Sequence, residues 1–214
     1  MARWLKILFF ALIVRPLVLV ILGLNIRHRE RLISHGPAII VANHNSHLDT
    51  LVLMSLFPLS QLHQLRPVAA FDYFMSNPFL AWFTTQVIGI IPIERKRQSS
   101  TQSDPLAQVH EALNNGDIII IFPEGTRGEP EKIQRFKTGI VHLTKAHPTV
   151  PTIPIFLHGL GKVLPKGEGL LVPFFCDVFI GTSLYWQGER KVFMGKLEQQ
   201  METLASERGC SKWE

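Results

Sequence analysis

Five short apolar runs recur through the body of the chain, and within them the apolar positions are continuous rather than alternating. The runs cover residues 38–42, 87–93, 117–122, 150–156 and 174–180. A strand that is apolar on both faces must be covered on both faces, as strands are in α/β proteins. The runs therefore predict an α/β fold with a mixed, mostly parallel sheet covered by helices.

Helical patterns lie between and after these runs. Ser46 and Asp49 form a possible capping box for a helix over residues 47–57, and Asp104 precedes a helix that Gly116 closes. Near the end of the chain, four apolar residues at helical spacing indicate core packing: Phe193, Leu197, Met201 and Leu204.

The N-terminal segment is the most apolar part of the sequence. Within residues 7–24, two apolar runs of eight are joined by Arg15 and Pro16, and a proline is expected to break a helix there. Eighteen residues barely span a bilayer, so a single N-terminal span and a kinked, monotopic segment in one leaflet both remain open. We expect residues 1–24 to anchor the chain in a membrane and residues 25–214 to form one domain.

The charge distribution supports a membrane surface rather than nucleic acid. The formal net charge is +5, and the first 100 residues hold ten Lys/Arg against four Asp/Glu. A zinc-finger spacing, an aromatic RNA-binding motif and a long basic tract are all missing from the sequence, so no nucleic-acid partner is expected. A cluster of arginines directly after the apolar segment predicts that the domain lies on the cytoplasmic face: Arg27, Arg29 and Arg31.

Polar segments follow three of the predicted strands. They cover residues 43–49, 94–97 and 123–128. Because ligands of open α/β sheets bind beyond the carboxyl ends of the strands, we expect these segments to meet in one site.

His44 and Asp49 stand five residues apart, in the predicted loop and the first helical turn. A carboxylate on one ring nitrogen leaves the other free to accept a proton, which is general-base machinery without a protein nucleophile. The substrate would supply its own hydroxyl, as in direct acyl transfer. Alternatively, Asp49 only caps the helix and His44 only bonds to backbone.

Two further segments carry anion-binding residue types. In Glu124-Gly125-Thr126-Arg127, the glycine allows close backbone approach and the guanidinium matches phosphate oxygens. Arg95, within the basic run 95–97, forms a second candidate. The alternatives are an ordinary turn with a surface ion pair and a solvated basic run.

Four ordered motifs resemble the blocks of the 1-acylglycerol-3-phosphate (lysophosphatidate) acyltransferase family. They are Asn43-His44-x4-Asp49, Gly89-x-x-Pro-Ile-Glu94-Arg95, Phe122-Pro-Glu-Gly-Thr-Arg127 and Val150-Pro-x-Ile-Pro154-Ile. The sequence departs from the family pattern at Glu94, where Asp is common, at Gly128, where Ser often stands, and in residues 69–74, which lack a common lysine. These departures bear on the acceptor rather than on acyl transfer.

The resemblance implies that His44 is the general base and Asp49 its orienting partner. It also implies that Lys137 lies near the acyl donor or the developing oxyanion. The residues that it implies for binding the acceptor's phosphate are Arg95, Glu124, Gly125, Thr126 and Arg127. The implied reaction moves a fatty acyl group from acyl-CoA or acyl carrier protein to a lysophospholipid such as 1-acylglycerol 3-phosphate. The product would be phosphatidic acid, in phospholipid biosynthesis, with no cofactor and with membrane lipids as partners.

Two other functions remain open. His44, His47 and Asp49 form an H-x-x-H-x-D pattern that could gather a metal ion in a metallohydrolase. A catalytically silent lipid-binding protein would use the same pocket without turnover.

Overall fold

The computed structural model describes residues 2–71, 77–93, 104–126, 133–163 and 175–209. Within these ranges, strands form one sheet in the order β1-β7-β6-β2-β5-β3-β4. Their bounds are β1 Leu24–Arg27, β2 Ala38–Ala42, β3 Leu65–Ala70, β4 Ile91–Ile93, β5 Ile118–Ile121, β6 Thr152–His158 and β7 Cys176–Ile180. Only the β6–β7 pair is antiparallel. The predicted mixed, mostly parallel sheet is confirmed.

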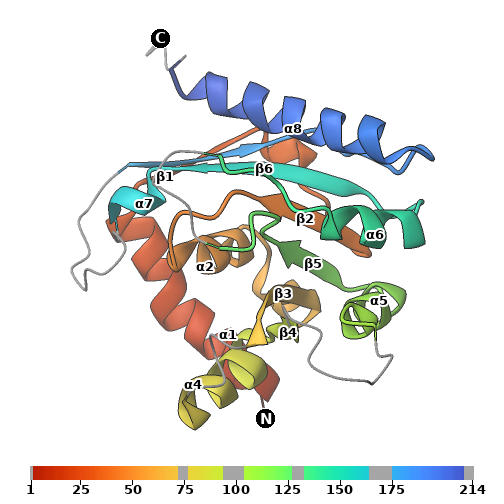
Figure 1. Ribbon diagram of the computed structural model, residues 1–214. Coiled ribbons are helices and arrows are strands. Elements are labelled where there is room, and N and C mark those ends of the chain that lie inside the picture. The colour runs from red at the N-terminus through yellow and green to blue at the C-terminus, as the bar shows by residue number, and fades with distance from the viewer. Residues whose placement is uncertain (1, 72–76, 94–103, 127–132, 164–174, 210–214) are drawn as a thin grey trace.

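Helices cover both faces of this sheet (Figure 1). On one face lie α1 (Ala2–Phe9), the π-helical η1 (Phe10–Val14) and η2 (Leu17–Ile21), and α2 (Leu48–Ser55). On the other lie α5 (Ala107–Asn114), α6 (Gly139–Ala146) and α8 (Arg190–Ser206). The remaining helices are η3 Arg29–Arg31, η4 Leu59–Gln64, α4 Pro78–Trp82, η5 Phe83–Ile88, α7 Leu160–Val163 and η6 Glu207–Gly209.

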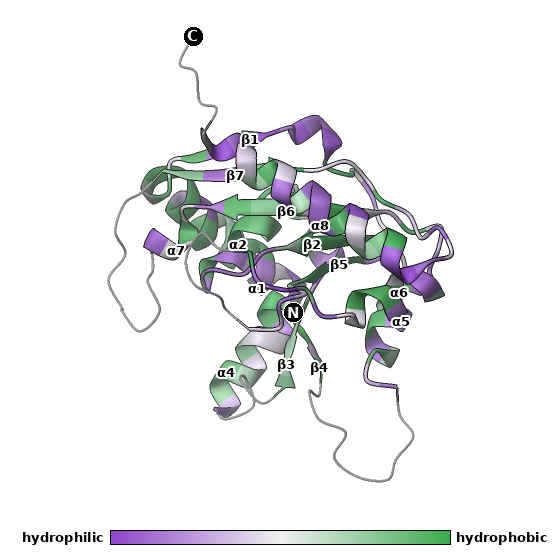
Figure 2. Ribbon diagram, turned by 45° about the horizontal axis from the view of Figure 1, so that its top comes forward, coloured by the Kyte–Doolittle hydropathy of each residue, from purple (hydrophilic) through white to green (hydrophobic). Residues whose placement is uncertain are grey.

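The central strands supply both halves of the core. In β2, Ile40 packs with the α1–α2 side and Ile39 with the α8 side, and both side chains are fully buried. The apolar strands in the middle of Figure 2 therefore serve two cores at once, which is why their sequences do not alternate.

The predicted strand over residues 87–93 is wrong in its first half. Val87 and Ile88 end the η5 helix, and only Ile91–Ile93 form a strand. Gly89, at φ +82°, closes the helix in the left-handed conformation that glycine adopts at low cost. Phe83 of η5 instead contacts a helix residue, since its ring lies edge-on to that of Phe9 in α1 with centroids 5.2 Å apart.

The N-terminal segment also differs from expectation at Pro16. The backbone stays helical at Arg15 and Pro16, so the predicted helix break does not occur. The proline interrupts α-helical bonding, but π turns lie on both sides of it, and the Arg15 guanidinium donates to the Phe57 carbonyl at 3.1 Å.

One stripe of this segment belongs to the protein core. Every fourth side chain points inward, which is a longer period than the 3.6 residues of an α-helix and fits the π turns: Lys6, Phe10, Val14, Val18 and Leu22. The last residue of the predicted anchor, Leu24, is the first residue of the edge strand β1.

In the described ranges, no helix combines the length and the apolar character needed to cross a bilayer. Of the arginines that follow the segment, Arg29 donates to the Leu56 carbonyl at 3.2 Å and Arg31 to the Ile180 carbonyl at 3.3 Å. These two guanidinium groups thus hold backbone within the fold.

Candidate active site

Two of the three predicted polar segments meet beyond the carboxyl ends of neighbouring strands. β2 and β5 are parallel neighbours, and the loops that follow them contact each other. The backbone N–H of His44, after β2, donates to Oε2 of Glu124, after β5, at 3.3 Å. The third predicted segment, 94–97, lies outside the described residues, as does its Arg95.

Asp49 organises the loop that carries His44. Its Oδ2 lies 2.9 Å from Nδ1 of the His44 ring and accepts the backbone N–H groups of Asn45 at 2.6 Å and Ser46 at 2.8 Å. The Ser46 hydroxyl in turn accepts the N–H of Leu48 at 3.3 Å. Asp49 therefore holds both the imidazole and the loop before α2, whereas the N-cap residue of α2 is His47 and makes no side-chain cap.

The His44 ring is fixed on a second side by stacking. It lies on the Phe122 ring with centroids 4.2 Å apart and planes 21° from parallel, and 22% of its side chain is exposed. Since Nδ1 faces Asp49, Nε2 is the ring nitrogen available to a substrate. Within the described residues, no serine, threonine or cysteine side chain bonds to this ring.

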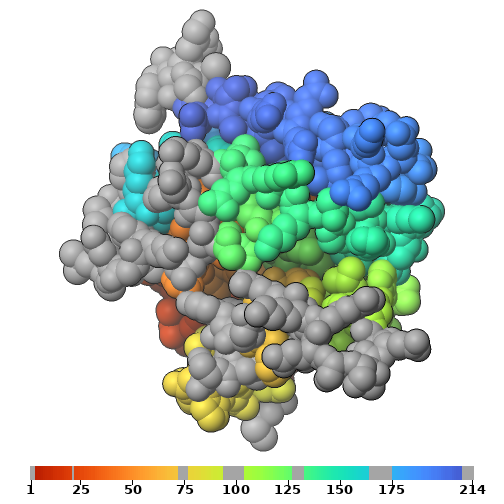
Figure 3. Space-filling view, in the orientation of Figure 1, coloured from red at the N-terminus to blue at the C-terminus, as the bar shows by residue number. Residues whose placement is uncertain are grey.

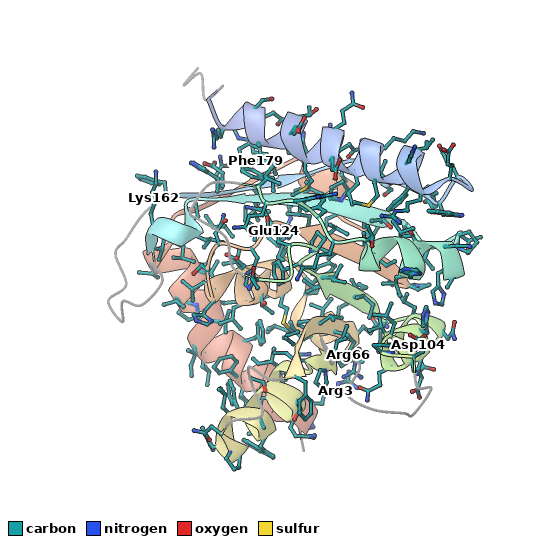
Figure 4. The ribbon with its side chains drawn as sticks, in the orientation of Figure 1. Arg3, Arg66, Asp104, Glu124, Lys162 and Phe179 are labelled. Carbon is teal, nitrogen blue, oxygen red and sulfur yellow. The ribbon has the colours of Figure 1, made fainter. Side chains whose placement is uncertain are left out.

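Glu124 lies inside the fold rather than on the surface. It is 3% exposed, and Figure 4 places its side chain in the interior of the molecule. Besides the His44 N–H, its carboxylate accepts the N–H of Gln134 at 3.3 Å through Oε1. Burial raises the pKa of Glu124 to about 7, although these two backbone hydrogen bonds lower it. A buried carboxylate bonded in this way ties the His44 loop to the segment around residue 134.

The remaining predicted binding residues lie beside it. The φ of Gly125 is +75°, and a Cβ there would lie 2.9 Å from Cε of Lys137, so the lysine side chain crosses directly over the glycine. Both Lys137 and Thr126 are exposed. Arg127 lies outside the described residues. The structure thus brings Gly125 and Lys137 together next to Glu124.

Two asparagines support this arrangement, and the sequence analysis gave neither a role. Asn43 exchanges two hydrogen bonds with the backbone of Leu157, at 2.9 and 2.7 Å, and so extends the β2–β6 pairing by a side chain. Asn45 also donates to the Leu157 carbonyl, at 3.2 Å. Buried amides directly after a buried strand are the sequence signal for such a role, since buried polar groups require partners.

The three residues of the possible metal motif do not form one cluster. Asp49 Oδ2 is occupied by the His44 ring and two N–H donors, and His47 is exposed at the start of α2. In the described part of the chain, no three or more His, Cys, Asp or Glu side chains are grouped so that they could hold a metal ion.

The sequence matches a protein family model and several known relatives. A family model described as "Acyltransferase" matches residues 23–158. The 1-acyl-sn-glycerol-3-phosphate acyltransferase BAT2 of Brassica napus, a chloroplastic protein, is 34% identical over 71% of this chain and 42% of its own length. The 1-acyl-sn-glycerol-3-phosphate acyltransferase of Pseudomonas aeruginosa is 28% identical over 82% of this chain and 65% of its own length. The chain thus spans about two fifths to two thirds of these relatives.

A solved structure has the same fold. The crystal structure of the 1-acyl-sn-glycerophosphate (LPA) acyltransferase PlsC from Thermotoga maritima superposes with a TM-score of 0.74 at 19% sequence identity. The match covers 100% of this chain and 81% of the other. The whole architecture described above, helices and sheet together, is therefore shared.

Proposed function

The chain belongs to the acyltransferase family, and from that premise we propose that it transfers a fatty acyl group from an acyl thioester to the free hydroxyl of a lysophospholipid. The observation that carries the proposal is the 2.9 Å contact between Asp49 and Nδ1 of His44, which leaves Nε2 free for a substrate proton. One motif, residues 43–49, contains this contact, and Phe122 and Glu124 of a second motif touch His44.

The proposed reaction uses this geometry. Nε2 of His44 takes the proton of the glycerol hydroxyl while the hydroxyl oxygen attacks the thioester carbonyl carbon. The tetrahedral intermediate expels the thiolate, which recovers the proton from the imidazolium, so an ester and a free thiol form without an acyl-enzyme. The negative charge of Asp49 stabilises the imidazolium formed in between.

Glu124 and Lys137 have proposed positioning and binding roles. Glu124 positions His44 through its backbone N–H, because a carboxylate that is 3% exposed is badly placed to touch a phosphate. Lys137, exposed over Gly125, is placed to meet the developing oxyanion or the donor. Arg95 and Arg127 stay predicted ligands of the acceptor's phosphate.

The acceptor we propose is 1-acylglycerol 3-phosphate, which would give phosphatidic acid. The names of the matched relatives support this choice. The donor is a thioester of coenzyme A or acyl carrier protein, and the reaction belongs to phospholipid biosynthesis.

We also propose that the enzyme lies on the cytoplasmic face of a membrane, with its first helices dipping into one leaflet. Large apolar side chains line the outer side of α1, η1 and η2: Trp4, Leu8, Leu12, Ile13, Leu19 and Val20. On the neighbouring α4, Phe79 and Trp82 are exposed as well. Such an apolar surface is favourable in contact with lipid and costly in water.

The test is incubation of the purified full-length protein with a panel of lysolipids and labelled acyl thioesters, followed by product mass. We expect one acyl chain to be added to lysophosphatidate, with the same rate after chelation of metals. Binding of lysolipid without product would identify a silent lipid-binding protein. Hydrolysis that EDTA abolishes and zinc restores would identify a metallohydrolase.

A further inference from the structure

A basic hollow lies next to the candidate active site, on the face of the sheet that α8 covers. It has a volume of about 290 Å³ and is formed by the loop before α6 and the first turns of α8. We call it the α8 pocket; its lining includes Arg135, Phe136, Arg190, Lys191, Met194 and Glu198. Figure 3 shows this loop, in green, lying against the blue α8.

The charge of the α8 pocket is strongly positive. Three cations, Arg135, Arg190 and Lys191, face one carboxylate, Glu198. Within the described residues, none of the three cations forms an ion pair with a carboxylate. All three cations are exposed, while the Phe136 side chain, which also lines the α8 pocket, is buried. Unpaired guanidinium and ammonium groups around a concave surface favour a small anion with several oxygens.

The α8 pocket is directly connected to the catalytic residues. Gln134, which precedes Arg135, donates its N–H to Glu124, the residue that also holds the His44 backbone. Lys137, which follows Phe136, crosses over Gly125. Arg135 and Phe136, which line the α8 pocket, lie between these two contacts. The four consecutive residues 134–137 therefore link the α8 pocket to the candidate active site.

α8, which forms one wall of the α8 pocket, and the exposed apolar helices lie on opposite faces of the sheet. The side chains of η1 pack against one face of the sheet and those of α8 against the other, and Figure 1 shows α1 and α8 on opposite sides of the sheet. A donor with a water-soluble, charged head and a fatty tail would thus place its head at α8 and its tail toward the membrane side, with the thioester between them.

We propose that the α8 pocket binds the phosphate groups at the nucleotide end of acyl-coenzyme A. This inference rests on the proposed function and names the donor that function left open. The α8 pocket is a concave surface of about 290 Å³, and this volume can hold the phosphate groups of a nucleotide. The pyrophosphate and the ribose phosphate supply the oxygens that two guanidinium groups and an ammonium group can share.

The experiment reverses two charges of the α8 pocket in the full-length protein, as Arg190→Glu together with Lys191→Glu. Both side chains are exposed, and glutamates in the first turn of a helix are favourable, so the fold is retained. The matched control is Lys145→Glu, an exposed cation in the last turn of α6 outside the α8 pocket. Calorimetry measures the binding of coenzyme A and of pantetheine, which lacks phosphates.

We expect the Kd for coenzyme A to rise at least about tenfold in the double variant, because hydrogen bonds between charged groups are lost. Pantetheine binding and the control variant should change less than about twofold, on the scale of ordinary surface substitutions. In turnover measurements on the double variant, the KM for acyl-CoA should rise. The kcat and the KM for lysolipid should stay unchanged.

Unchanged coenzyme A binding, or none in the original protein, would overturn the proposal. A rise in KM for acyl carrier protein thioesters alone would overturn it in favour of a carrier protein. Calorimetry measures binding without turnover. If the protein bound coenzyme A in a charge-dependent way but had no transferase activity, the proposed function would be rejected and the assignment of coenzyme A to the α8 pocket would stand.

Discussion

Oδ2 of Asp49 holds both the His44 ring and the loop that carries it. The same oxygen lies 2.9 Å from Nδ1 of His44 and accepts the N–H groups of Asn45 and Ser46. Oδ1 of Asp49 is buried without a partner among the described residues. Among the described residues, one oxygen therefore makes all the orienting contacts, and we expect the negative charge of the group to matter mainly for the proposed proton transfer.

This division predicts different outcomes for two substitutions of Asp49. In Asp49→Asn, the amide oxygen can replace Oδ2, so we expect a thermal midpoint close to that of the original protein and a kcat lower by at least roughly 10²-fold. In Asp49→Ala, two buried N–H groups lose their acceptor, which costs about 1–3 kcal/mol each in the free energy of unfolding. Calorimetry and initial rates measure the two effects, and an active Asn variant would show that the charge is dispensable.

Glu124 should make stability depend on pH. Burial raises its pKa from 4.5 to about 7 in the folded protein, so between these values the folded state binds the proton more tightly than the unfolded state. The free energy of unfolding contributed by this group is present below pH 4.5 and is lost as the pH rises to about 7. Urea titrations at pH 5 and pH 8 measure this loss, and Glu124→Gln should flatten it. An equal slope in both proteins would refute the assignment.

The sequence predicted the strands whose both faces are buried and missed those with mixed surroundings. The run 38–42 coincides with β2, because every one of its residues is buried. β3 contains Arg66 and Pro67, which argue against a strand, yet Arg66 pairs with Asp117 at 3.0 Å and the strand lies between β4 and β5. A tertiary ion pair of this kind leaves no local pattern.

For the candidate site, the sequence predicted that the loops after β2 and β5 meet but not how each residue is used; the third predicted loop, 94–97, lies outside the described residues. Strand order is enough to bring the loops after β2 and β5 together. The burial of Glu124 and the bond from His44 N–H depend on the path of both loops, which no spacing encodes. The role of Asn43 depends on the register of β6 and was missed for the same reason.

The N-terminal helices should contribute to stability as part of the core. Phe10→Ala removes a fully buried ring and should lower the free energy of unfolding by about 3–5 kcal/mol. Ile13→Ala, three residues away and 57% exposed, should change it by less than about 0.5 kcal/mol. Denaturant titration compares the two. Equal effects of the two substitutions would mean that this segment is not packed as described.

The outer stripe of the same helices should determine membrane binding. Leu12 and Leu19 are 70% and 74% exposed, and each contributes about 1.5–3 kcal/mol when its side chain enters an apolar phase. Leu12→Ser with Leu19→Ser should therefore weaken vesicle binding by roughly 10²-fold or more, in low and high salt alike. Val192→Ser, on the opposite face of the sheet, is the control and should bind as before. Sedimentation with vesicles measures the binding of each protein. Binding of the double variant as strong as that of the original protein would contradict the contact with the leaflet.

The most direct test of acyl transfer by His44 is the initial rate of lysophosphatidate acylation in His44→Ala beside His47→Ala. The ring of His44 is held by Asp49 and Phe122, whereas His47 is exposed at the start of α2. We predict a loss on the order of 10²–10⁴-fold or more for His44→Ala, and most of the activity retained in His47→Ala. Activity that survives in His44→Ala, or that is lost only in His47→Ala, would contradict the account.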